Sequence, residues 1–346
     1  MARKRAALSV VGVVVCALSL VGCANGGLST LSKKATVTTS ASASSATASN
    51  DCQTSPNLIS ACTRLGDLTT LDPCGLISLG ELPPDLAASP GDRDSLDHCD
   101  FTIAAGSDKS VLLEIGQLEP AVGNGVRFGA GSEELQPQGL SLEEGSLDRG
   151  ECDDALQFGG DLVDLEINAF VLTGAGSPAL CAAVTEVGKA LGNVLNGKAQ
   201  MPHFTVPKNS IARLKACGLV NGAQIGSYTV DGQPDSASGH SCQWQPDSTN
   251  PAVEVGIILK IDRNLDTVGA RSQIDGLNSY TVKYSPTDFS RCEVDANRAP
   301  WGTAGNGLME IASVWAMEPA GQVDTACSLA TQLANVVWPK LPPLRS

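Results

Sequence analysis

Eight cysteines constrain the fold of this chain more than any other feature, because they form one spacing pattern that is used twice. The two sets are Cys74, Cys99, Cys152 and Cys181, and Cys217, Cys242, Cys292 and Cys327. Their separations are 25, 53 and 29 residues in the first set and 25, 50 and 35 residues in the second. The sequence Cys74-Gly75-Leu76-Ile77 also matches Cys217-Gly218-Leu219-Val220. Agreement in spacing and in flanking residues indicates an internal duplication.

Disulfide pairing is expected for these cysteines, because an even number remains in a chain with export signals. Four cysteines allow three connectivities in each copy. We expect first-with-second and third-with-fourth pairing, because the first cysteine precedes one element and the second begins the next strand. Cys52 and Cys62 have no counterpart in the second copy and are expected to pair with each other. The predicted bridges are Cys52–Cys62, Cys74–Cys99, Cys152–Cys181, Cys217–Cys242 and Cys292–Cys327.

Zinc is the alternative interpretation of a cysteine-rich chain. The sequence has no Cys-x-x-Cys pair and no His-x-x-x-His pair, which are typical spacings of zinc ligands. It also lacks a glycine-rich phosphate loop followed by Lys-Ser or Lys-Thr. We therefore expect no metal and no cofactor.

Strands with one buried face are predicted after the second and third cysteines of each copy, because apolar residues recur at every second position. After the second cysteine the pattern covers residues 111–115 and residues 253–261. After the third cysteine it covers residues 163–171 and, more weakly, residues 311–317. Strands that follow one another without intervening helices favour a mainly antiparallel sheet.

A helix is predicted at the fourth cysteine of each copy. In the first copy Ser177 is the expected N-cap, Pro178 lies in the first turn, and apolar residues continue at helical spacing to Val194. In the second copy Asp324 is the expected cap and Pro339 ends the helix. The predicted fold class is α+β, with two tandem related domains, each a mainly antiparallel sheet packed by a C-terminal amphipathic helix and stapled by disulfides.

The first fifty residues predict export and lipid anchoring. Three basic residues precede an apolar stretch, residues 6–20, which is typical of a signal peptide. The stretch ends in Leu20-Val21-Gly22-Cys23, which resembles the bacterial lipobox, and the resemblance implies that Cys23 is acylated and becomes the first residue. Residues 24–50 are rich in Ser, Thr and Ala and cannot bury enough apolar surface to offset the entropy of ordering, so they are expected to form a flexible tether.

These features divide the chain into four predicted parts. Residues 1–22 are the signal peptide, residues 23–50 the tether, residues 51–200 the first disulfide-stapled domain and residues 201–346 the second. The roughly 295 residues after the tether suit two domains. We expect the protein at the extracytoplasmic face of the cell membrane, with its lipid anchor as the membrane contact.

The chain is acidic, with 37 Asp and Glu residues against 23 Lys and Arg residues. Removing the signal peptide deletes three of those basic residues and no acidic one. Nucleic acid is therefore excluded as an expected partner. The runs Glu133-Glu134, Glu143-Glu144 and Asp153-Asp154 do not fit the spaced carboxylates of a calcium loop, so they are interpreted as a solvated acidic face.

The second copy carries motifs of a known family, namely Cys217-Gly218, Cys242-Gln243-Trp244 and Cys292-Glu293-Val294. At these residues the chain resembles the lipoproteins of the mycobacterial LprB and LprC type, an actinobacterial family whose function is itself unknown. The first copy departs from the pattern with Phe101 in place of the Trp and Asp153-Asp154 after its third cysteine. The resemblance implies a cell-envelope lipoprotein, here with two tandem copies, and supplies no catalytic residues.

Catalytic motifs are not found in the sequence. It lacks the Gly-x-Ser-x-Gly of serine hydrolases and the Ser-x-x-Lys with Lys-Thr-Gly of penicillin-binding enzymes. The three histidines are interpreted as polar residues at strand edges or in the interdomain linker: His98, His203 and His240. Trp244 and Trp315 fall in predicted strands and are expected in the core, whereas Trp301 lies in a loop and is the candidate for an exposed ligand contact.

The leading functional hypothesis is a non-catalytic binding or structural module with an envelope protein or a glycan as its partner. The duplication, the anchor and the missing catalytic motifs favour it. A carboxylate-dependent envelope hydrolase is an alternative, because a glycosidase needs only two suitably spaced carboxylates. A third hypothesis, based on fold-level analogy alone, is an accessory or sensor protein beside an envelope kinase or transporter.

Overall fold

A computed structural model describes residues 59–76, 88–90, 95–104, 110–120, 131–135, 139–145, 151–159, 163–171, 178–197, 200–230, 233–234, 237–245, 253–263, 265, 269–302 and 307–344. The predicted signal peptide, Cys23 and the tether lie outside the described residues. Within the described part of the chain, no helix is long and apolar enough to cross a membrane.

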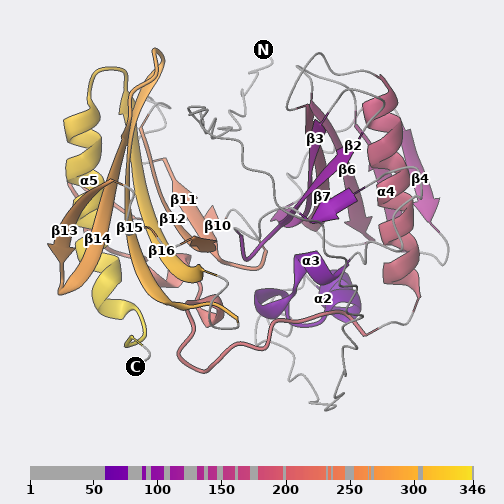
Figure 1. Ribbon diagram of the computed structural model, residues 1–346, viewed down its shortest axis with the longest axis horizontal. Helices are drawn as coiled ribbons and strands as arrows, with labels where there is room; N and C mark the ends of the chain where they lie inside the picture. The colour runs from indigo at the N-terminus through magenta and orange to yellow at the C-terminus, as the bar shows by residue number, and fades with distance from the viewer. Residues whose placement is uncertain are drawn as a thin grey trace, which may run out of the picture. The chain divides into compact units, whose positions relative to one another are not determined.

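The first copy forms a sheet of seven antiparallel strands in the order β1-β2-β3-β7-β6-β5-β4 (Figure 1). The expected strands at residues 111–115 and 163–171 are confirmed as parts of β3 and β7. The bounds are β1 Ala88–Pro90, β2 Cys99–Ala104, β3 Ser110–Pro120, β4 Gly131–Leu135, β5 Leu140–Glu144, β6 Glu151–Phe158 and β7 Val163–Val171.

The second copy forms another seven-stranded antiparallel sheet, in the order β10-β11-β12-β16-β15-β14-β13. Counted within each copy, the strand order is the same in both sheets, which agrees with the duplication inferred from the cysteines. The bounds are β10 Gln233–Pro234, β11 Ser241–Trp244, β12 Glu254–Arg263, β13 Ala270–Ile274, β14 Leu277–Tyr284, β15 Phe289–Pro300 and β16 Leu308–Pro319. A separate short hairpin consists of β8 (Gln224–Ile225) and β9 (Tyr228–Thr229).

The two long helices begin near the fourth cysteine of each copy, as expected. They are α4 (Pro178–Asn196) and α5 (Val323–Val337). Asp324 is not the N-cap of α5, because the helix starts one residue earlier and Asp324 lies in its first turn, where a carboxylate still complements the helix dipole. The shorter helices are α2 (Ile59–Leu65), α3 (Pro73–Leu76) and the 3₁₀ turns η2 (Leu68–Thr70), η3 (Ile211–Arg213), η4 (Cys217–Leu219) and η5 (Trp338–Lys340).

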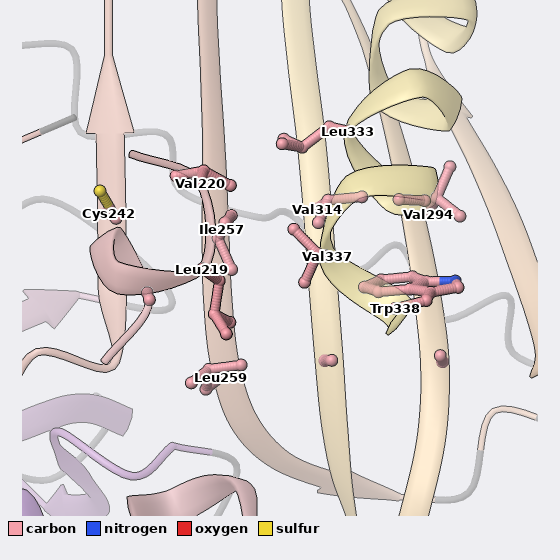
Figure 2. Packing of buried hydrophobic residues seen from close by; sticks show 14 of the residues in the cluster. Leu219, Val220, Cys242, Ile257, Leu259, Val294, Val314, Leu333, Val337 and Trp338 are labelled. Atoms are coloured by element: carbon pink, nitrogen blue, oxygen red, sulfur yellow. The ribbon is translucent and has the colours of Figure 1, made fainter. Parts of the chain in front are cut away.

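Each sheet buries one face with its long helix. Leu333 and Val337 of α5 belong to the same buried cluster as Val314, Val294 and Ile257 of the second sheet (Figure 2). The first sheet has a corresponding cluster that includes residues of α4. Side chains alternate along a strand, so the residues between these core positions face away from the helix.

Four disulfides confirm the expected pairing in both copies. They are Cys74–Cys99, Cys152–Cys181, Cys217–Cys242 and Cys292–Cys327. The last bridge of each copy joins a central strand to the long helix, because Cys152 and Cys292 lie in β6 and β15. Cys62 is disulfide-bonded, and its expected partner Cys52 lies outside the described residues.

Candidate functional site

A network of charged side chains occupies the face of the second sheet that points away from α5. We call it the charged face. Val294 and Val314 enter the core, so their strand neighbours point the other way. The register places Glu293 opposite Trp315 and Asp295 opposite Ser313 on β15 and β16. The charged face comprises Lys260, Arg291, Glu293, Asp295, Ser313 and Trp315.

Glu293 is the centre of this network. Its carboxylate accepts hydrogen bonds from Lys260 Nζ at 3.2 Å, Arg291 Nη2 at 3.2 Å and Ser313 Oγ at 2.8 Å. Burial opposes ionisation of Glu293, but the two cations outweigh it and lower the pKa to about 2. Burial also acts against the charge of Lys260, yet Glu293 and the neighbouring Asp residues raise its pKa. Glu293 is therefore ionised and neutralised within the fold.

The pKa of Asp295 is shifted in the opposite direction from the pKa of Glu293. Asp295 is 3 % exposed, and burial together with the negative charge of Glu293 raises its pKa to about 7. The negative charge of Glu293 disfavours a second negative charge beside it, so Asp295 is the carboxyl group of the two that retains a proton more readily. A low-pKa and a high-pKa carboxyl group thus share one site, a combination that also occurs in enzymes.

Trp315 lies flat across the sheet beside this network. A Cβ at Gly256, its partner on β12, would lie 2.5 Å from the indole ring, so only glycine leaves room there. The Arg291 guanidinium lies 4.6 Å from the ring centroid in a cation–π contact. Trp315 is buried, as expected, and it lies on the charged face, outside the helix-side cluster.

Trp301 is not the exposed contact that the loop position suggested. Its side chain is only 9 % exposed and belongs to the second core. The ring packs edge-on against Phe204, with centroids 5.1 Å apart. Phe204 comes from the linker region, and this long-range partner is the physical reason that a loop tryptophan is covered.

The acidic runs differ in environment. Glu133 and Glu134 are exposed, as a solvated face requires. Asp154 is not solvated, because it is 1 % exposed and accepts a hydrogen bond from the backbone N–H of Gly145 at 3.0 Å. Burial raises the pKa of Asp154. Adjacent strand residues point to opposite faces of a sheet, and on β6, which lies inside the sheet, the face to which Asp154 points is the core.

A buried ion pair joins the two copies at equivalent positions. Asp97 and His240 each lie two residues before the second cysteine of their copy. His240 Nδ1 lies 2.5 Å from Asp97 Oδ1 and Nε2 lies 3.1 Å from the Ala212 carbonyl oxygen. Ser238 Oγ also donates to Asp97. Both ring nitrogens face acceptors, so the geometry favours the doubly protonated imidazolium.

Next to this ion pair, each copy packs one apolar residue into or against the core of the other copy. Leu96 belongs to the core of the second sheet, and Ala237 packs against the core of the first. The Ala237 N–H donates to the Leu118 carbonyl at 2.7 Å. Each copy therefore contributes a residue to the core of the other.

Replacing Asp97 with asparagine is expected to lower the free energy of unfolding by about 1–3 kcal/mol, the cost of weakening a buried charged hydrogen bond. Burial alone would lower the pKa of His240, but the Asp97 carboxylate outweighs it and raises the pKa. This stabilisation is fully present below the ordinary histidine pKa of about 6.5 and is lost as pH rises through the raised folded pKa.

NMR titration of the His240 ring, with His98 and His203 as references in the same spectrum, measures the effect. The Asp97→Asn variant should titrate at lower pH and lose less stability above pH 7 than the wild type does. An unchanged His240 titration would show that Asp97 does not hold the proton.

A row of polar side chains crosses four strands of the first sheet, on the face away from α4. We call it the acidic face. Register pairs join Asp100 of β2 to Glu114 of β3, Glu114 to Asn168 of β7, and Asn168 to Asp153 of β6. Three of the four members are carboxylates, and all four are half-buried. His98, directly before β2, lies at the same end of the row.

Sequence reasoning missed both faces. Their signal is a polar residue at every second position of a strand, as in Glu293 and Asp295 or in Asp164, Glu166 and Asn168. Such alternation was interpreted only as the solvated side of a sheet. The cross-strand partners that make these residues a site come from distant parts of the chain.

Comparison with known proteins found no relative of this chain. No family model matches the chain, no curated protein matches it, and no solved structure matches it. What the protein does must therefore be argued from the chemistry of its two sheet faces.

Proposed function

We propose that the chain is a cell-envelope lipoprotein, anchored through Cys23 outside the cytoplasmic membrane, that acts as a non-catalytic binding module. Its binding surface in this proposal is the acidic face of the first sheet. The four disulfides support an oxidising compartment. The lipobox-like sequence supports the anchor.

The contrast between the two sheet faces carries this proposal. On the second sheet, Lys260 and Arg291 neutralise Glu293. Arg291 directly precedes the third cysteine of its copy, and the equivalent residue of the first copy is Glu151. The first sheet therefore has a carboxylate where the second has a cation. A surface with carboxylates on several neighbouring strands favours a partner that presents positive charge.

The geometry gives less support to the hydrolase alternative. Glycosidases hold their two carboxyl groups about 5–5.5 Å or about 6.5–9.5 Å apart, so that a sugar or a water fits between them. Glu293 is instead held by hydrogen bonds from Lys260, Arg291 and Ser313. Both sides of the Trp315 indole are also occupied, by Gly256 and Arg291. The network suits a structural role better than sugar stacking.

In-cell photo-crosslinking tests the binding proposal. A photoreactive residue at Asn168 of the acidic face is expected to capture one reproducible envelope partner, and the same probe at exposed Gln243 of the second sheet is the matched control. Neutralising Glu114 and Asp153 to the amides should reduce capture. Equal products from both probe positions would contradict the proposed surface.

Two further measurements accompany that experiment. A Cys23→Ser variant is expected to stay unprocessed or to be released from the membrane fraction. Purified cell-wall glycans are expected to remain intact when incubated with the protein. Glycan turnover that the Asp295→Asn variant abolishes would overturn the non-catalytic proposal in favour of the hydrolase.

A further inference from the structure

Three side chains at one end of the acidic face bring their ligand atoms together. His98, Asp100 and Glu114 each place one nitrogen or oxygen atom within 4.8 Å of the others. His98 Nε2 lies 3.9 Å from Asp100 Oδ1 and 3.8 Å from Glu114 Oε2. We propose that these three residues form a binding site for a divalent transition-metal ion, with Zn²⁺ as the best match.

The sheet explains why the three residues converge. Residues two apart on an extended chain point to the same side, so His98 and Asp100 share a face. Glu114 lies directly opposite Asp100 in the antiparallel β2–β3 pair. A rigid pair of central strands thus fixes two ligands, and the residue just before β2 adds the third.

The separations suit a metal ion better than direct hydrogen bonds. Both His98 distances exceed the roughly 3.2 Å limit of an N–H···O bond. Ligands bound to Zn²⁺ at about 2.0–2.2 Å lie roughly 3.3 Å apart in tetrahedral geometry. The two His98 separations would each shorten by about half an ångström to reach that spacing. The oxygens of Asp100 and Glu114, which lie within 4.8 Å of each other, would approach by up to about 1.5 Å through side-chain rotation.

Electrostatics favours a cation at this point. Like charges directly opposite each other on paired strands destabilise a sheet, and Asp100 and Glu114 are such a pair. A divalent ion between them would replace repulsion with attraction. Because metal ligands must be deprotonated, a metal ion would bind here more weakly at low pH.

The donor set indicates the class of metal. One imidazole nitrogen with two carboxylates suits Zn²⁺ or a similar transition ion, whereas Ca²⁺ and Mg²⁺ prefer oxygen ligands alone. Three protein ligands leave one tetrahedral position open. The side chains are 24 %, 15 % and 20 % exposed in the order His98, Asp100 and Glu114, so water or a ligand group can reach the ion.

The second copy supplies an internal comparison. The residues equivalent to His98 and Asp100, counted from the second cysteine, are Ser241 and Gln243. The partner of Gln243 across the β11–β12 pair is Gly256, where the first copy has Glu114. None of these three is a favoured metal ligand. The proposed site is therefore a property of the first copy alone.

Calorimetric titration of the mature protein with Zn²⁺ tests the site directly. We expect one equivalent to bind, with lower affinity at acidic pH because the ligands must be deprotonated. His98→Ala and the isosteric Glu114→Gln should each weaken binding at least about 100-fold, since loss of even an outer-shell partner costs about 10–100-fold. Gln243→Ala is the matched control and should bind as the wild type does. Cobalt substitution should give the visible absorption of a four-coordinate ion, which both ligand variants lose.

The possible outcomes distinguish failure of the metal site from failure of the proposed binding function, on which this inference partly rests. Retained binding in His98→Ala and Glu114→Gln, or no binding by the correctly disulfide-bonded wild type, would overturn the metal site. Metal binding that persists when Asn168 crosslinking finds no partner would leave the site in place and remove the proposed partner function. Circular dichroism and disulfide mapping confirm that each variant is folded.

Discussion

Replacing Glu293 with glutamine is expected to lower the free energy of unfolding by about 3–5 kcal/mol, the usual cost of removing one member of a buried ion pair. The variant keeps the size of the side chain but leaves Lys260 and Arg291 without the carboxylate that neutralises them. Urea denaturation at pH 7, followed by circular dichroism, measures the loss.

Glu254→Gln is the matched control, because it makes the same chemical change on the same sheet. Glu254 accepts a hydrogen bond from Gln245 at an exposed position, so its replacement should cost less than about 1 kcal/mol. Combining Glu293→Gln with Lys260→Met should restore part of the lost stability, because the orphaned cation is then removed. A loss of under 1 kcal/mol in Glu293→Gln would show that the network is dispensable.

Replacing Asp295 with asparagine is expected to stabilise the protein above pH 7. The folded pKa of Asp295 is about 7, against 3.8 for an ordinary Asp, so the folded state binds more protons than the unfolded state between about pH 4 and pH 7. Stability from this residue therefore falls as pH rises through that window. Asparagine mimics the protonated acid and cannot ionise. A shift of about three pKa units, at about 1.4 kcal/mol per unit, corresponds to a gain of roughly 4 kcal/mol at pH 8.

Thermal and urea unfolding from pH 4 to pH 8 measure this difference. The wild type should lose stability relative to Asp295→Asn as pH rises, and the two should converge near pH 4. Asp288→Asn, on the exposed turn before β15, is the control and should run parallel to the wild type. A gain for Asp295→Asn that does not depend on pH would rule out titration as its cause.

The architecture of each copy follows from local patterns in the sequence. Alternating apolar residues such as those of residues 163–171 can bury one face only as a strand, and β7 has those same bounds. The cysteine pairing follows because first and second cysteines flank neighbouring elements. The N-cap of α5 is Gln322, two positions before the predicted Asp324. The prediction was wrong because a good capping residue is also favourable in the first helical turn.

The candidate sites could not be predicted in the same way. Glu293 and Lys260 meet because β15 and β12 both flank β16. No local sequence pattern predicts which strands are neighbours in the sheet. Trp301 is covered by Phe204 from the linker. The ligand set of His98, Asp100 and Glu114 needs the β2–β3 register, which the alternation of apolar residues along one strand does not fix. Contacts between distant segments decided each of these environments.

The pairing of Asp97 with His240 helps to determine which copies of a duplicated unit associate with each other. When two identical units meet through the same surface, each residue at the centre of the contact faces its own copy. Two identical first copies would there set Asp97 against Asp97, and two second copies would set one imidazolium against another. The divergence of this one position makes the unlike pair the favoured one. It thereby favours contact between a first copy and a second copy over contact between two like copies.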